Sequence, residues 1–185
     1  MSTAAMDVSR FLQVPGPDPV LRLVVLDPAG ALGPALRGAL RPETAVLSAT
    51  PGHPLPPRSG TAEGLPWALL AVAGAGPAGE TLPAAVVRAV RAARAAGAPP
   101  ARVLVWPGPA PAYGPGDAAA PSGDPLPCPV TLLLTGPDTG AVGAWQRLSP
   151  DGFTVRLLGP DAWTPAGGLP VTARLLKEEL RIWPA

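Results

Sequence analysis

The sequence predicts an α/β protein in which a parallel β-sheet lies between two layers of helices. Short segments rich in Val and Leu recur along the chain and are almost continuously apolar, which is typical of parallel strands buried on both faces. Segments with helical character alternate with them, and this alternation favours a parallel sheet covered on both sides. The chain of 185 residues is long enough for one domain with a substantial core.

The first part of the domain predicts a strand, a weak helix and a second strand. VLRLVVL at 20–26 is rich in β-branched residues and apolar throughout except for Arg22. ALGPALRGAL at 31–40 predicts only a short, weak helix, because its glycines and proline oppose helix formation. TAVLSA at 44–49 predicts the second strand, and the breaker-rich residues 50–66 predict a loop.

The middle of the chain holds the strongest helix signal. WALLAVA at 67–73 predicts a third strand, and RVLVW at 102–106 predicts a fourth. The helix expected between them covers 81–97, with Pro83 near its start and Gly97 where the chain must leave the helix.

A linker without periodicity is expected at 107–129, where proline and glycine recur. Beyond it, VTLLLT at 130–135 predicts a strand and 140–147 a short helix. FTVRLL at 153–158 predicts the last strand, and an amphipathic pattern at 170–182 predicts the last helix.

Composition favours a folded chain with long loops. The sequence has 22 Gly and 29 Pro, a level that by itself is typical of disorder. Hydrophobic residues make up 47% of the chain, which is enough to offset the ordering entropy by burial. We therefore expect an irregular N-terminal arm at 1–19 and a single domain at 20–185.

Charge and composition argue against several classes of function. The formal net charge is +1 and no basic run is present, so we expect no nucleic-acid partner. No apolar run reaches the length of a membrane span, and Asp7 and Arg10 interrupt any export signal, which indicates a cytoplasmic protein. One His and one Cys cannot form a zinc site, and we expect no metal and no cofactor.

Ligands of open parallel sheets bind beyond the carboxyl ends of the strands, so the loops at those ends supply the candidate site residues. The backbone amides of Ala29 and Gly30, after the first strand, are candidate oxyanion donors, and the alternative is an ordinary strand-to-helix turn. Asp138 follows the fifth strand and is either a functional carboxylate or the cap of the next helix. Asp161 and Trp163 follow the last strand, and Trp163 is either a ligand contact or a packed side chain.

Two further residues have reactive side chains. His53 lies in the loop after the second strand and is either an exposed loop residue or a group at the rim of a pocket. Cys128 lies between two prolines, which favours a small buried apolar side chain over a nucleophile.

Several segments, taken in order, resemble the type II thioesterases, stand-alone α/β-hydrolases that edit carrier-bound acyl groups in polyketide and non-ribosomal peptide pathways. LRLVVLDPAGA is similar to that family's first strand and P-H-A-G-G loop, and AVLSATPGH to its strand ending in L-P-G-R. PWALLAVAGA resembles its P-F-A-L-F-G-H-S-M-G elbow, and FTVRLLGPDAW the segment that ends in P-G-G-H-F.

The resemblance implies a catalytic triad whose positions are degenerate here. The family's nucleophile falls on Ala73 and its catalytic histidine on Ala162. Its G-x-x-D motif is one residue shorter here, as Gly136-Pro137-Asp138, so Asp138 is an inexact match. Alanine can neither donate a proton nor accept one, so the resemblance implies a pseudoenzyme.

The resemblance also implies a truncated α/β-hydrolase-like fold. The linker at 107–129 stands where the family has a helical lid over its acyl pocket. Loss of the lid is expected to expose a cleft with Val72, Tyr113 and Trp163 at its rim, a surface that attracts a protein partner. The expected partner is a biosynthetic enzyme, a carrier protein or a second copy of the chain, and a small-molecule ligand is a further possibility.

Three functional hypotheses follow. The first is a non-catalytic accessory, binding or scaffold protein of a natural-product pathway. The second is a pathway enzyme, such as a cyclase, isomerase or hydrolase, whose acid or base has moved to His53, Tyr113, Asp138 or Asp161. The third is a decayed remnant without function.

Overall fold

The computed structural model describes residues 19–40, 42–49, 64–72, 81–107, 125–136, 139–150, 152–159 and 169–181. Six strands form one sheet in which every neighbouring pair is parallel, as the sequence predicted. The order across the sheet is β2-β1-β3-β4-β5-β6. The strands are β1 (Leu21–Leu26), β2 (Thr44–Ala49), β3 (Trp67–Val72), β4 (Arg102–Trp106), β5 (Val130–Leu134) and β6 (Phe153–Leu157).

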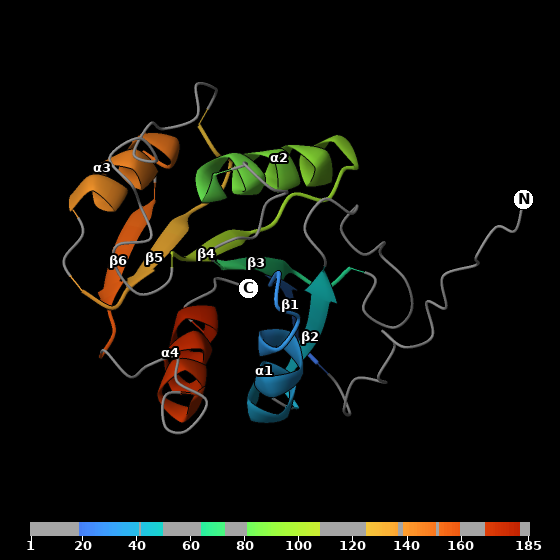
Figure 1. The fold of residues 1–185 in the computed structure, drawn as a ribbon. Coiled ribbons are helices and arrows are strands. Elements are labelled where there is room, and N and C mark those ends of the chain that lie inside the picture. The colour runs from blue at the N-terminus through green and yellow to red at the C-terminus, as the bar shows by residue number, and fades with distance from the viewer. Residues whose placement is uncertain are drawn as a thin grey trace, which may run out of the picture.

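Four helices cover the two faces of the sheet in a three-layer arrangement (Figure 1). One face carries α2 and α3, and the opposite face carries α1 and α4. The sequence predicted all four helices and placed their ends within about two residues. The helices are α1 (Leu32–Leu40), α2 (Leu82–Ala95), α3 (Thr139–Leu148) and α4 (Leu169–Arg181).

Each face of the sheet has its own hydrophobic core, because side chains alternate between the faces along each strand. On the α2/α3 face, Leu69 and Leu132 pack with Val86 of α2 and Trp145 of α3. On the α1/α4 face, buried strand residues such as Leu70, Leu104 and Leu133 pack with Leu36 of α1 and Leu176 of α4. The central strands are therefore buried on both faces, which is why their sequences are apolar without alternation.

The helix α1 forms where the sequence predicted a short helix. The expectation of a weak helix rested on the glycines and proline of 31–40. In the structure Leu36 and Leu40 are completely buried against the sheet, and the loop before the helix satisfies its first backbone N–H group. Burial and capping thus outweigh the low intrinsic helix propensity of the segment.

The end of the expected linker, at 125–129, has no regular secondary structure but is packed against the domain. Leu126 and Cys128 are buried, and the Leu126 N–H donates to the Leu148 carbonyl at the end of α3 over 2.7 Å. The Ser149 hydroxyl donates to the Cys128 carbonyl over 3.1 Å. Residues 108–124 lie outside the described residues. The expected loss of the helical lid falls on these residues and stays a prediction.

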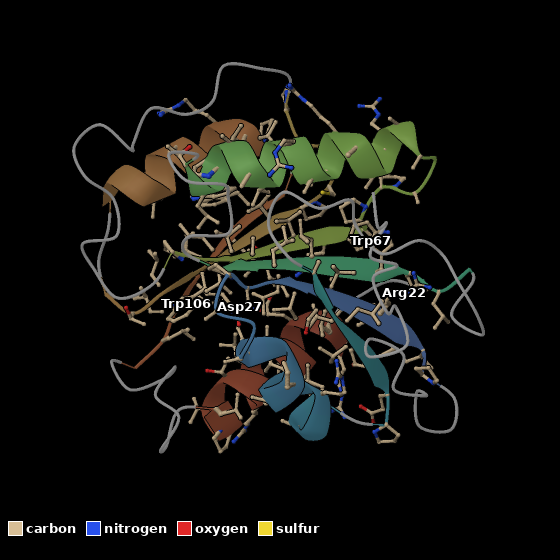
Figure 2. The ribbon with its side chains drawn as sticks, turned by 45° about the vertical axis from the view of Figure 1, so that its right-hand side comes forward. Arg22, Asp27, Trp67 and Trp106 are labelled. Atoms are coloured by element: carbon tan, nitrogen blue, oxygen red, sulfur yellow. The ribbon has the colours of Figure 1, made fainter. Side chains whose placement is uncertain are left out.

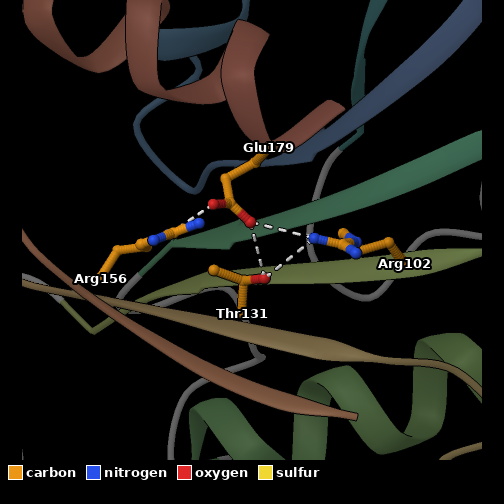
Figure 3. Close-up of polar contacts among 4 residues, drawn as sticks. All are labelled: Arg102, Thr131, Arg156 and Glu179. Carbon is orange, nitrogen blue, oxygen red and sulfur yellow. Dashed lines mark hydrogen bonds and ion pairs between the residues drawn. The ribbon is translucent and has the colours of Figure 1, made fainter. Parts of the chain in front are cut away.

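A buried carboxylate fixes α4 to the sheet (Figure 3). Glu179 of α4 is 2% exposed, and its two oxygens accept hydrogen bonds from Arg102 of β4, over 3.0 Å, and Arg156 of β6, over 2.5 Å. The Thr131 hydroxyl of β5 lies 3.2 Å from the Glu179 carboxylate. One helix is thereby joined to three neighbouring strands.

Within the described ranges, no helix is both long enough and apolar enough to cross a membrane.

Candidate functional site

The strand order places a candidate site between β1 and β3. From β1 the chain moves outward to β2, and it then returns to β3 on the other side of β1. The helices that follow β1 and β3 lie on opposite faces of the sheet (Figure 1). In open α/β sheets the crevice at such a reversal, beyond the carboxyl ends of the two strands, is where ligands bind. We call this edge of the sheet the carboxyl edge.

Three residues reach this edge at the same level. The register pairs Leu26 with Ala71 and Val72 with Trp106, so Asp27, one residue beyond Leu26, stands level with Val72 and Trp106. Figure 2 shows Asp27 and Trp106 at one end of the sheet, with Arg22 and Trp67 at the other. The carboxyl edge therefore combines one carboxylate with apolar side chains at the reversal of strand order.

Asp27 organises the turn between β1 and α1. Its side chain is buried, and one carboxylate oxygen accepts the N–H of Ala29 over 2.9 Å. The other oxygen accepts the N–H of Leu32, the first residue of α1, over 2.7 Å. Asp27 thus satisfies a backbone donor that a helix start leaves without an intrahelical partner.

The proposed oxyanion donors are engaged within this turn. The Ala29 N–H donates to the Asp27 carboxylate, and the Gly30 N–H donates to the Asp27 carbonyl over 3.1 Å. Gly30 has a φ of 67°, a left-handed conformation that glycine adopts without strain. The strand-to-helix turn therefore describes this loop, and neither amide is available for an oxyanion in this conformation.

Val72 ends β3 at the carboxyl edge, but its side chain is 6% exposed and belongs to the α1/α4-face core. The expected open rim therefore does not include Val72 as an exposed residue. Its burial follows from its place on a central strand, between Asp27 and Trp106 of the neighbouring strands. The other expected rim residues, Tyr113 and Trp163, lie outside the described residues.

Most of the sequence-predicted site residues also fall outside the described ranges, so the structure neither brings them together nor separates them. Ala73 begins a segment, 73–80, that lies outside the described residues between Val72 and Thr81. The remaining such residues are His53, Ala73, Asp138, Asp161 and Ala162.

Asp27 and Trp106 are site residues that the sequence analysis did not single out. Asp27 could have been found as the first residue after a strand and just before a helix, where a short acidic side chain caps well. Trp106 is the last residue of the fourth predicted strand, and its side chain is half-buried against the α1/α4-face core. An aromatic ring at a strand end is a surface that small-molecule sites use.

The described part of the carboxyl edge is poor in reactive groups. Among the described residues that directly follow the strands, Asp27 is the one titratable side chain, and no Ser, Cys or His is present. These residues are 27–31, 107, 135–136 and 158–159. In the described part of the chain, no group of three or more His, Cys, Asp or Glu side chains could hold a metal ion.

Cys128 lies before β5, away from the carboxyl edge, and is buried. Burial disfavours the charged thiolate and raises the pKa of the Cys128 thiol from 9.0 to about 11. A thiol that remains protonated at neutral pH is a poor nucleophile. The geometry agrees with the interpretation of Cys128 as a small apolar side chain of the core.

No protein-family model matches the sequence, and no curated protein matches it. A solved structure described as "RedJ with PEG molecule bound in the active site" is similar in fold, with a TM-score of 0.54. The match covers 91% of this chain and 93% of that chain at 20% sequence identity. The likeness thus extends over nearly the whole α/β fold, and at this identity it supports the fold alone.

Proposed function

We propose that the protein is a non-catalytic, thioesterase-like accessory, binding or scaffold component of a polyketide, non-ribosomal peptide or other natural-product pathway. The observation that carries the proposal is the alanine at both reactive positions of the thioesterase pattern, Ala73 and Ala162. Acyl transfer by a triad needs a hydroxyl or thiol nucleophile and a base that takes its proton. A methyl side chain performs neither role.

The strand topology supports the match of these positions. In α/β-hydrolases the nucleophile, the acid and the histidine follow one another in chain order. Here Ala73, Asp138 and Ala162 come after β3, β5 and β6, whose carboxyl ends lie at the same edge of the parallel sheet. The order of the strands thus matches that of a triad, while alanine stands at the positions of the nucleophile and the histidine.

The sequence of the connection after β3 also lacks the nucleophile of a catalytic elbow. An elbow presents its nucleophile on one sharp turn between strand and helix. Here β3 ends at Val72, and α2 begins at Leu82 after its cap Thr81. The sequence of 73–80, AGAGPAGE, contains no Ser, Thr or Cys.

The geometry at β1 argues against proton transfer by Asp27. The one titratable group among the described strand-end residues is Asp27, and both its oxygens accept backbone N–H groups. A carboxylate held in this way organises the turn rather than reacting. The relocated-enzyme hypothesis therefore rests on His53, Tyr113, Asp138 and Asp161, which lie outside the described residues.

We expect the purified protein to show no thioesterase activity. Acyl-coenzyme A and acyl-N-acetylcysteamine substrates should hydrolyse at the rate of buffer alone, and a fluorophosphonate probe should label no serine. The His53→Ala and Asp27→Asn variants are the controls, and both should match the wild-type background. Saturable hydrolysis by the wild-type protein would overturn the non-catalytic proposal, and its loss in the His53→Ala variant would support the relocated enzyme.

The pathway role is tested in the organism that produces the protein. Deletion of the gene should lower the yield of a natural product, and a plasmid-borne wild-type copy should restore it. A copy carrying His53→Ala should restore the yield equally, because the proposed role needs no base. A deletion that leaves every product unchanged would contradict the accessory role and favour a remnant without function.

A further inference from the structure

The strand β6 lies at the end of the sheet, and its outer edge carries a regular row of backbone donors and acceptors. Within the described chain it pairs only with β5. The Leu158 N–H donates to the Leu134 carbonyl over 2.6 Å, and the Val130 N–H donates to the Gly152 carbonyl over 2.8 Å. Alternate residues of a strand bond to the same neighbour, so the even-numbered residues of β6 face β5.

The odd-numbered residues therefore direct their backbone groups away from the sheet. Phe153, Val155 and Leu157 each present an N–H and a C=O toward the outer edge, and no hydrogen bond of these groups is found in the described structure. Such a row of donors and acceptors is a template for another strand. No proline interrupts it and no Lys blocks it.

The same three side chains form an apolar stripe on the α2/α3 face. Phe153 and Val155 are partly buried against the core of that face. Leu157 is 71% exposed, the highest value among the exposed large hydrophobic residues of the described chain. The intervening side chains point to the other face, where Arg156 is held by Glu179. The solvent exposure of the stripe thus increases from the partly buried Phe153 to the exposed Leu157.

We propose that β6 pairs with β6 of a second copy of the chain, antiparallel, around a two-fold axis through Val155. Phe153 then lies opposite Leu157 of the second copy, and Val155 lies opposite its own counterpart. In an antiparallel ladder, residues that exchange two hydrogen bonds alternate with residues that exchange none. This register places every outward-facing residue at a hydrogen-bonding position.

A second copy fits this edge because the edge is complementary to itself. The open Leu157 is covered by the aromatic ring of Phe153, an aromatic–aliphatic cross-strand pair. Arg156 lies opposite Thr154, so no like charges meet across the axis, and the Arg156 charge is already paired with Glu179. A two-fold contact also closes on itself and leaves no further edge of β6 to extend the assembly.

The small size of the contact sets its strength. Pairing of two five-residue strands buries much less surface than the roughly 1,600 Å² that a typical stable interface buries. The dimer is therefore weak and reversible, and it forms at high protein concentration.

Sedimentation velocity over a concentration series tests the dimer. Leu157→Lys places a charge in the pair with Phe153 and should raise the dimer dissociation constant by about tenfold or more. Val20→Lys is the matched control, because Val20 is likewise exposed, at 66%, and lies next to β1, which three strands separate from β6. It should leave the constant unchanged. A protein that stays monomeric throughout, or a dimer insensitive to Leu157→Lys, would overturn the proposal.

Amide hydrogen exchange tests the register. The amides of Phe153, Val155 and Leu157 should exchange fast in the dilute protein and slow down as the dimer forms. The Thr154 and Arg156 amides, which face β5, should show no such dependence. Fast exchange of the three outward amides at every concentration would overturn pairing with a second copy, and protection only on addition of another protein would assign the edge to that protein instead.

Discussion

Gly33 of α1 lies in close contact with Ser48 of β2. A Cβ atom at this position would lie 2.0 Å from Ser48 Oγ and 3.1 Å from Ser48 Cβ. The Ser48 hydroxyl is buried and has no hydrogen-bond partner among the described residues. The contact between helix and strand therefore depends on the missing side chain of Gly33 rather than on a hydrogen bond from Ser48.

We expect Gly33→Ala to lower the free energy of unfolding by about 1 kcal/mol, because the added methyl group forces Ser48 or the helix to move. Ser48→Ala in the same chain should recover part of this loss. Gly38→Ala is the control within the same helix, since a Cβ there meets nothing within 4 Å, and it should stabilise by up to about 1 kcal/mol. Urea denaturation measures all three, and equal effects at Gly33 and Gly38 would refute the close contact.

The buried Cys128 predicts a loss of stability at alkaline pH. In the unfolded chain the thiol ionises near its ordinary pKa of 9.0, whereas burial raises the pKa of Cys128 in the folded protein to about 11. Between these values the unfolded state binds fewer protons, so the free energy of unfolding falls as pH rises. Cys128→Ala should show a smaller fall from pH 9 to 11 in denaturant titrations, and identical slopes for the two proteins would contradict the assignment.

At the scale of elements, the buried Glu179 carboxylate adds ion pairs to the apolar packing that holds α4 on the sheet. Glu179→Gln removes the charge that both Arg102 and Arg156 contact, and we expect a loss of about 3 kcal/mol, because breaking a buried ion pair leaves charge uncompensated. Glu178→Gln is the matched control, because it makes the same change at the neighbouring position of α4. Its partner Arg174 is exposed, so that loss should be below about 1 kcal/mol. Comparable losses at the two positions in urea denaturation would show that Glu179 does not anchor the helix.

The elements also show what the sequence could predict. The strands were found almost to the residue because both-face burial makes the central ones almost continuously apolar, as LRLVVL and VTLLL are apart from Arg22 and Thr131. The burial that supports α1 could not be predicted from its own residues, because Leu36 and Leu40 pack in a core that several strands and α4 share. The same holds for the ion pairs of Glu179, whose partners lie 77 and 23 residues away in the chain.

At the scale of the whole molecule, the candidate site was only partly predictable. The carboxyl edge follows from the alternation of strands and helices. The reversal between β1 and β3 needs the strand order, which no local pattern encodes. Ala29 and Gly30 were identified as possible donors, but their engagement by Asp27 depends on the three-dimensional path of the turn. Val72 is buried for the same reason, since its neighbours come from β1 and β4.

The two faces of the sheet must be completed at different times during synthesis. The helices of one face, α2 and α3, leave the ribosome before α4, which follows all six strands. Until then the apolar side chains that α4 will cover, among them Leu104 and Leu133, have only α1 to shield them. A nascent chain that pauses after β6 therefore exposes hydrophobic surface on the α1/α4 face of the sheet. Exposed surface of this kind is recognised by chaperones and drives aggregation.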